Sequence, residues 1–133
     1  MRTVIVGCGR VGSNLARQLS REGDEVAVVD FSEAAFNRLG EDFVGEMVFG
    51  TGVDEDVLRR AGTAQADAFV AVTNADTTNI MAAQLAKYLF GVKQVICRIY
   101  DPSREDVYAE LGLQTICPTT IGAEKVKRFF ERS

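Results

Sequence analysis

The chain has 133 residues, of which 47% are hydrophobic and 26% charged, and its formal net charge is −4. This length and composition predict one globular domain and exclude both a disordered chain and a two-domain enzyme. The acidic balance offers no basic surface for nucleic acid, and no apolar run is long enough for a signal peptide or a membrane span. We therefore expect neither nucleic-acid binding nor direct membrane insertion.

The first predicted strand, residues 3–6, leads into a glycine-rich turn that opens a helical pattern. The turn reads Gly7-Cys8-Gly9-Arg10-Val11-Gly12. Gly7 allows the tight turn, Gly9 lets the backbone approach a pyrophosphate, and Gly12 lets the helix pack closely on the strand. The N-terminus of the helix adds free N–H groups and a positive dipole. A G-x-G-x-x-G motif in this position predicts dinucleotide binding.

Cys8 lies inside this turn and is either a reactive thiol or a small side chain packed beneath the loop; we favour the second interpretation. Cys97 and Cys117 form no CxxC pair and the sequence contains no histidine, so we expect no metal site. The odd number of cysteines suits a reducing cytosol. Without histidine or a G-x-S-x-G motif, the sequence offers no recognisable general acid–base, and we expect no catalytic residues.

The second predicted strand, residues 25–29, ends at Asp30. A carboxylate here can accept both ribose hydroxyls of an adenosine and would repel a 2′-phosphate, which favours NAD(H) over NADP(H). No arginine directly follows Asp30 to bind that phosphate. The alternative is a turn carboxylate before Phe31 and Ser32, where we expect Ser32 to cap a short helix.

Four further strands are predicted at residues 46–49, 68–72, 94–99 and 114–117, with helical patterns between them. Asp54 is expected to cap one helix, and Asp76 or a neighbouring threonine the longest one. On that longest helix the predicted buried stripe is Met81, Leu85, Tyr88 and Leu89. A last helical stretch runs from about Ile121 to the end of the chain.

Short apolar strands that alternate with helices predict an α/β fold. We expect a Rossmann-type, doubly wound, six-stranded parallel sheet with the strand order 3-2-1-4-5-6. In such a sheet the ligand crevice lies at the carboxyl ends of strands one and four, which places Thr73 and Asn74 beside the ligand. Arg10 is either a phosphate ligand or a solvated surface side chain, and Arg98 on the fifth strand is positioned to act on a ligand.

Four segments together resemble the RCK N-terminal (TrkA-N) domain of Trk and Ktr potassium-uptake regulatory subunits and of potassium-channel gating domains. They are residues 7–12, 28–30, 50–62 and 66–79, and the resemblance extends over nearly the whole chain. It implies a regulatory subunit, not an enzyme, that gates a membrane potassium transporter or channel subunit. It also implies a homodimer or higher RCK ring, cytoplasmic and held at the inner face of the membrane through its partner.

The resemblance implies NAD(H), or alternatively ATP or ADP, in a single cleft. The positions that match the family's ligand residues are Gly7, Gly9, Arg10, Val11, Asp30, Thr73 and Asn74. We place Cys8, Gly12, Phe31, Gly50, Thr51 and Arg98 at the same predicted site.

Three features depart from the family pattern. Thr51 stands where many members have an acidic residue near the adenosine, and Thr119 follows Pro118 where Ktr-type members have a glutamate for a divalent cation. The sequence also contains no C-terminal RCK lobe, so we treat residues 1–133 as a single RCK N-terminal domain. The alternatives are the cofactor domain of an NAD-dependent oxidoreductase and a nucleotide sensor that acts on another partner.

The last helical stretch has two interpretations. Val126 lies three and four residues before Phe129 and Phe130, so the three share a helix face with each other. This apolar stripe either folds back on the sheet or forms a surface for a second subunit, and the family resemblance implies the second.

Overall fold

The structure is a computed structural model that describes residues 1–131. In chain order its elements are β1 (Arg2–Val6), α1 (Arg10–Arg21), β2 (Glu25–Asp30), η1 (Glu33–Leu39), β3 (Glu46–Phe49), α2 (Glu55–Arg60), η2 (Thr63–Gln65), β4 (Ala68–Ala71), α3 (Asp76–Gln84), η3 (Leu85–Leu89), β5 (Gln94–Arg98), η4 (Pro102–Arg104), α4 (Glu105–Glu110), β6 (Gln114–Ile116) and α5 (Pro118–Phe130). The label η denotes a 3₁₀ helix, except for η3, which is a π-helix that continues α3.

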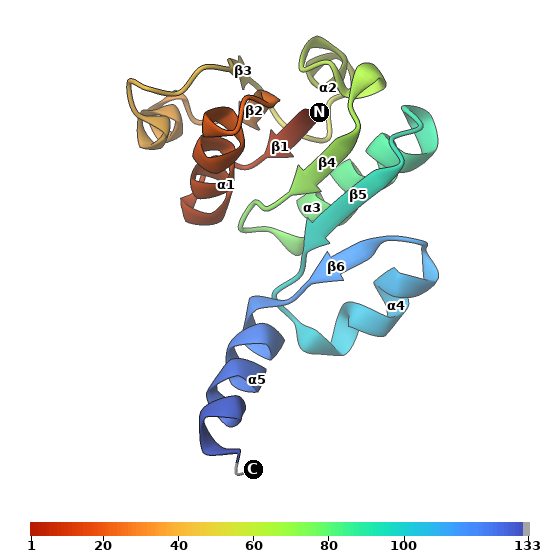
Figure 1. The fold of residues 1–133 in the computed structure, drawn as a ribbon. Helices are drawn as coiled ribbons and strands as arrows, with labels where there is room; N and C mark the ends of the chain where they lie inside the picture. Colours follow the sequence, from red (N-terminus) through yellow and green to blue (C-terminus); the bar gives the residue numbers. More distant parts are fainter. Residues whose placement is uncertain (132–133) are drawn as a thin grey trace.

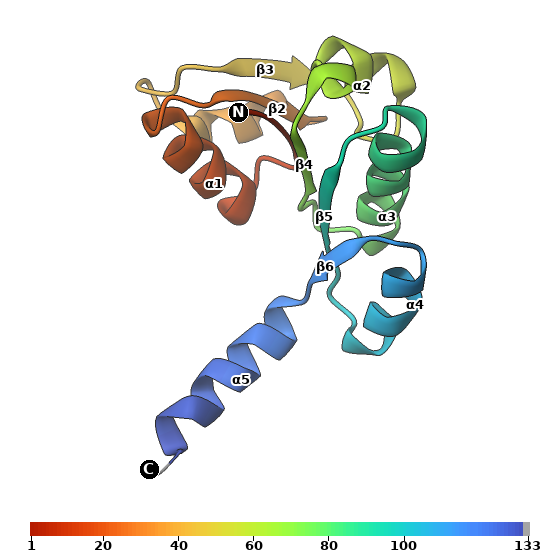
Figure 2. The same cartoon turned by 45° about the vertical axis from the view of Figure 1, so that its right-hand side comes forward.

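The six strands form one parallel sheet in the order β3-β2-β1-β4-β5-β6, which confirms the predicted fold. Side chains alternate between two cores because successive residues of a strand point to opposite faces. Val4 and Val6 pack with α2 and α3 on one face, whereas Ile5 packs with α1 and η1 on the other. Figures 1 and 2 show these helices on the two sides of the sheet.

One of the three predicted helix caps is confirmed. The Asp54 carboxylate accepts hydrogen bonds from two backbone N–H groups of the first turn of α2. Ser32 lies at the N-cap position of η1, but its backbone N–H donates to Asp30 Oδ1 at 2.8 Å, so the carboxylate shapes this turn. The prediction that Asp76 or a neighbouring threonine caps α3 was wrong, because the N-cap residue is Ala75 and no described side chain caps the helix. Asp76 Oδ1 instead accepts from the backbone N–H of Tyr100 at 2.8 Å and ties α3 to the segment after β5.

The predicted buried stripe of the longest helix was wrong at three of its four positions. Met81, Tyr88 and Leu89 are 53%, 65% and 51% exposed, whereas Leu85 is partly buried and packs against the core. The side chains that face the sheet are Asn79, Ile80, Ala82, Ala83 and Ala86. Alanines let the helix approach the strands closely, which turns the larger side chains outward. Hydrophobicity alone therefore selected the wrong face of the helix.

Helix α5 extends away from the sheet and its helices, as Figures 1 and 2 show from two directions. Phe129 and Phe130 are 79% and 75% exposed, which overturns the interpretation that this helix folds back on the sheet. The predicted helix continued to the end of the chain, but residues 132–133 lie outside the described part. Within residues 1–131, no helix combines the length and apolar character that crossing a membrane requires.

Candidate functional site

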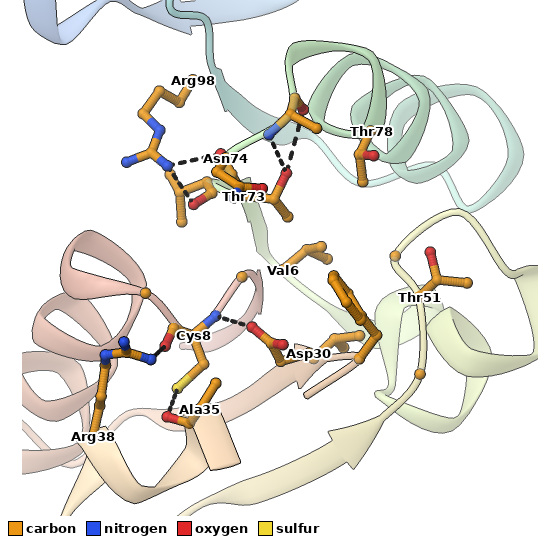
Figure 3. A pocket seen from close by; sticks show the side chains of 18 residues that line it. Val6, Cys8, Asp30, Ala35, Arg38, Thr51, Thr73, Asn74, Thr78 and Arg98 are labelled. Atoms are coloured by element: carbon orange, nitrogen blue, oxygen red, sulfur yellow. Dashed lines mark hydrogen bonds between the residues drawn. The ribbon is translucent and has the colours of Figure 1, made fainter. Parts of the chain in front are cut away.

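A cleft of about 460 Å³ lies over the carboxyl ends of β1, β2 and β4, where the strand order reverses (Figure 3). Of the positions predicted from the sequence, those that line it are Gly7, Cys8, Gly9, Asp30, Phe31, Gly50, Thr51, Thr73, Asn74 and Arg98. Arg10 and Val11 are exposed on the first turn of α1, and neither they nor the buried Gly12 belong to this lining.

The glycine loop has the geometry that its sequence predicted. Gly7 has a φ of +107°, and its N–H donates to the carbonyl of Val29 at 2.8 Å, so the turn is fixed to the neighbouring strand. A Cβ at Gly12 would lie 1.8 Å from the carbonyl oxygen of Gly7, which only a glycine avoids. At Gly9, which lines the cleft, a Cβ would have no described atom within 4 Å.

The Asp30 carboxylate holds the loop as well as facing the cleft. Its Oδ2 accepts from the backbone N–H of Cys8 at 2.8 Å, and its Oδ1 accepts from that of Ser32, also at 2.8 Å. These bonds confirm the turn interpretation of Asp30. A carboxylate has about four acceptor sites, so two stay open for a ligand in the cleft.

Cys8 is buried beneath the loop, and its Sγ donates to the carbonyl of Ala35 at 3.3 Å. Burial raises the pKa of this thiol to about 11; the Asp30 carboxylate adds to the rise, while the Arg38 guanidinium opposes it. A thiol with this pKa is a poor nucleophile at neutral pH. The structure thus supports the packing interpretation of Cys8.

A buried amide that the sequence analysis missed fixes the Thr73 side of the cleft. Asn79 is 0% exposed, and its Oδ1 accepts from the backbone N–H of Thr73 at 2.8 Å and from Thr73 Oγ1 at 2.6 Å. Its Nδ2 donates to the carbonyls of Thr73 and Arg98, both at 3.0 Å. All four hydrogen-bonding sites of the amide are thereby used, and the ends of β4 and β5 are joined. The sequence signal that could have identified Asn79 is its position as a polar residue on the alanine-rich face of α3.

Three charged side chains line the cleft: Asp30, Arg38 and Arg98. Two cations and one anion give this lining a positive balance, although the chain has a net charge of −4. Arg98 Nη2 donates to the carbonyls of Val72 and Thr73 at 2.9 and 2.7 Å, and its guanidinium lies 4.7 Å from the centre of the Tyr100 ring. The cleft therefore suits an anionic ligand. Within the described residues, no group of three His, Cys, Asp or Glu side chains lies together as metal ligands would.

A profile of the TrkA-N domain family matches residues 3–118. The chain belongs to the TrkA-N domain family. Among relatives of this TrkA-N domain, the Trk system potassium uptake protein TrkA of Streptomyces coelicolor is 48% identical over 128 residues, which cover 96% of the chain and 57% of the relative. A TrkA homolog of Pyrococcus abyssi is 33% identical over 131 residues, covering 98% of the chain and 52% of the relative. The TrkA-N chain thus spans about half the length of the curated relatives it matches.

Solved structures share the fold of this TrkA-N domain. The TrkA-N domain of the inner membrane protein ybaL from Escherichia coli has a TM-score of 0.87 at 21% identity, covering 98% of this chain and 96% of that one. The RCK domain of GsuK has a TM-score of 0.80 at 25% identity, covering 94% of this chain and 27% of that one. GsuK has also been solved with ADP and with NAD.

Proposed function

We propose that this TrkA-N domain binds an adenine nucleotide, NAD(H) or alternatively ATP or ADP, and regulates a membrane potassium transporter or channel subunit. The observation that carries the proposal is a positively balanced cleft bounded by the glycine loop and Asp30. The names of the relatives, potassium uptake proteins, support the transport role, and the nucleotides bound to GsuK support the ligand class.

The cleft residues fit such a ligand from end to end. The ribose hydroxyls would donate to the free acceptor sites of Asp30, and the phosphates would lie over Gly9 and the first turn of α1. Thr73, Asn74 and Arg98 would hold the distal end, with the Thr73 backbone already fixed by Asn79. No step of chemistry is required of these residues, because the role is binding.

Regulation requires that binding be transmitted to a partner. We propose that α5 pairs two copies of the chain, since its apolar stripe is exposed on a helix that leaves the body of the domain. The paired domains would lie on the cytoplasmic side of the membrane, held there by the transporter, so that a change in the cleft alters the spacing of the two copies. The assembly is either this dimer or a larger ring built from it.

Calorimetry tests the ligand, and co-purification tests the role. NADH, ADP and ATP are expected to bind and to compete with one another, and the chain is expected to co-purify with a potassium-transporter membrane subunit. Failure of all three nucleotides to bind would overturn the proposal. Steady oxidation of NADH with a panel of small carbonyl compounds would instead favour the oxidoreductase alternative.

A further inference from the structure

Arg38 lines the cleft, although it lies eight residues beyond Asp30 in the sequence and on a different element, η1. In Figure 3 the side chains of Arg38 and Asp30 lie on opposite sides of Cys8. Arg98 lies across the cleft from both of them. The arginine thus lies at the Asp30 end, where the adenosine ribose would bind. An anionic group that reached Arg38 would be attached to the ribose rather than to the distal end of the nucleotide.

The base of the Arg38 side chain is fixed, but its guanidinium keeps most of its donors. Leu39 beside it is buried, and the Arg38 carbonyl accepts from Arg17 Nη1 at 3.3 Å, which anchors this end of η1. The guanidinium itself donates from Nη1 to the carbonyl of Cys8 at 3.4 Å, near the limit of a hydrogen bond, and the residue is exposed. This contact orients the group towards the loop without using its capacity to bind an anion.

Asp30 repels a ribose phosphate less than its sequence position implied. Each carboxylate oxygen already accepts a backbone N–H at 2.8 Å, and these donors disperse its negative charge. The lining carries two arginines against this one carboxylate, because Thr51 stands where many family members have an acidic residue.

We propose that Arg38 is a specificity-determining residue that binds a phosphate carried on the adenosine ribose of the ligand. The ligands that the cleft accepts then include adenine nucleotides with a ribose phosphate, either at the 2′ position, as in NADP(H), or at the 3′ position. A guanidinium suits this task because its planar donors bind phosphate oxygens in pairs. The inference rests on the proposed function, and it reduces the preference for NAD(H) over NADP(H) that Asp30 alone predicted.

Calorimetry with the wild-type chain, Arg38→Ala, Arg38→Lys and the control Arg21→Ala tests the inference. Arg21 is exposed in the last turn of α1 and lies outside the cleft lining. Wild type is expected to bind NADPH no more than about tenfold more weakly than NADH, and Arg38→Ala to weaken NADPH at least about tenfold more than NADH. Arg38→Lys should recover part of this loss, and Arg21→Ala should change neither affinity. Adenosine 2′,5′-bisphosphate and adenosine 3′,5′-bisphosphate, compared with AMP, identify the phosphate position.

Two results would overturn the role of Arg38. One is rejection of NADPH and of both bisphosphates by a chain that binds NADH and AMP. The other is an equal loss of NADH and NADPH affinity in Arg38→Ala, which would show that the side chain only positions the loop through the Cys8 carbonyl. Absence of binding by every adenine nucleotide would overturn the proposed function itself, so the two failures are distinguishable.

Discussion

Removing the side-chain amide of Asn79 tests whether one buried residue holds the cleft in shape. In Asn79→Ala, the backbone N–H of Thr73 loses its 2.8 Å acceptor and the carbonyl of Arg98 loses its 3.0 Å donor. The Thr73 carbonyl retains a bond from Arg98 Nη2 at 2.7 Å. Two backbone groups therefore lose these partners in a region where Asn79 itself is 0% exposed.

Each buried polar group without a partner costs about 1–3 kcal/mol, so the variant should lose about 2–4 kcal/mol of unfolding free energy, with water at the half-buried Thr73 reducing the upper end. A loss of this size is a large fraction of the stability of a small domain, about 5–15 kcal/mol. Nucleotide affinity should fall as well, because the loop that contains Thr73 and Asn74 is no longer fixed.

Urea unfolding followed by circular dichroism measures the first effect, and calorimetry with ADP measures the second. Thr77→Ala is the matched control, since Thr77 is an exposed residue on the first turn of the same helix, and its replacement should cost no more than about 0.5 kcal/mol. If Asn79→Ala is as stable as the control and binds ADP normally, the hydrogen bonds of Asn79 do not shape the cleft.

Three further predictions follow from the loop and from α5. Gly12→Ala places a Cβ 1.8 Å from a loop carbonyl and should lower the midpoint of urea unfolding, whereas Gly9→Ala should leave the midpoint unchanged and weaken ADP binding; the reverse pattern would refute the assigned roles. Because the pKa of Cys8 is raised from 9.0 to about 11, the folded thiol keeps a proton that the unfolded thiol loses, so its contribution to stability is present below pH 9 and is lost as the pH rises to 11. Alkylation of Cys8 at pH 8 should accordingly be much slower in the folded chain than in urea, and equal rates would contradict its burial. Phe129→Asp combined with Phe130→Asp should give a folded, ADP-binding monomer in light scattering, and a variant that stays dimeric would show that α5 is not the interface.

The sequence by itself determined the fold and one wall of the cleft. Continuous apolar runs such as residues 68–72 predict strands buried on both faces, and their alternation with helices allows few topologies other than the observed order. The glycine loop and Asp30 could also be predicted from the sequence. A tight turn after β1 and a carboxylate at the end of β2 are local features that residue spacing indicates.

The sequence also placed Thr73, Asn74 and Arg98 at the cleft, whereas only the tertiary structure showed Arg38 in its lining and Asn79 behind Thr73. The buried face of α3 depended on how closely the helix approaches the sheet, which favoured alanines over Met81 and enclosed Asn79. Arg38 reached the Asp30 end through the path of η1, at a separation in sequence that no local pattern encodes. Helix α5 has an apolar stripe that suits either a core or an interface, and its direction away from the sheet excludes packing on this chain's own sheet. Periodicity records which residues share a face, whereas the neighbour that the face meets is set by the packing of distant elements.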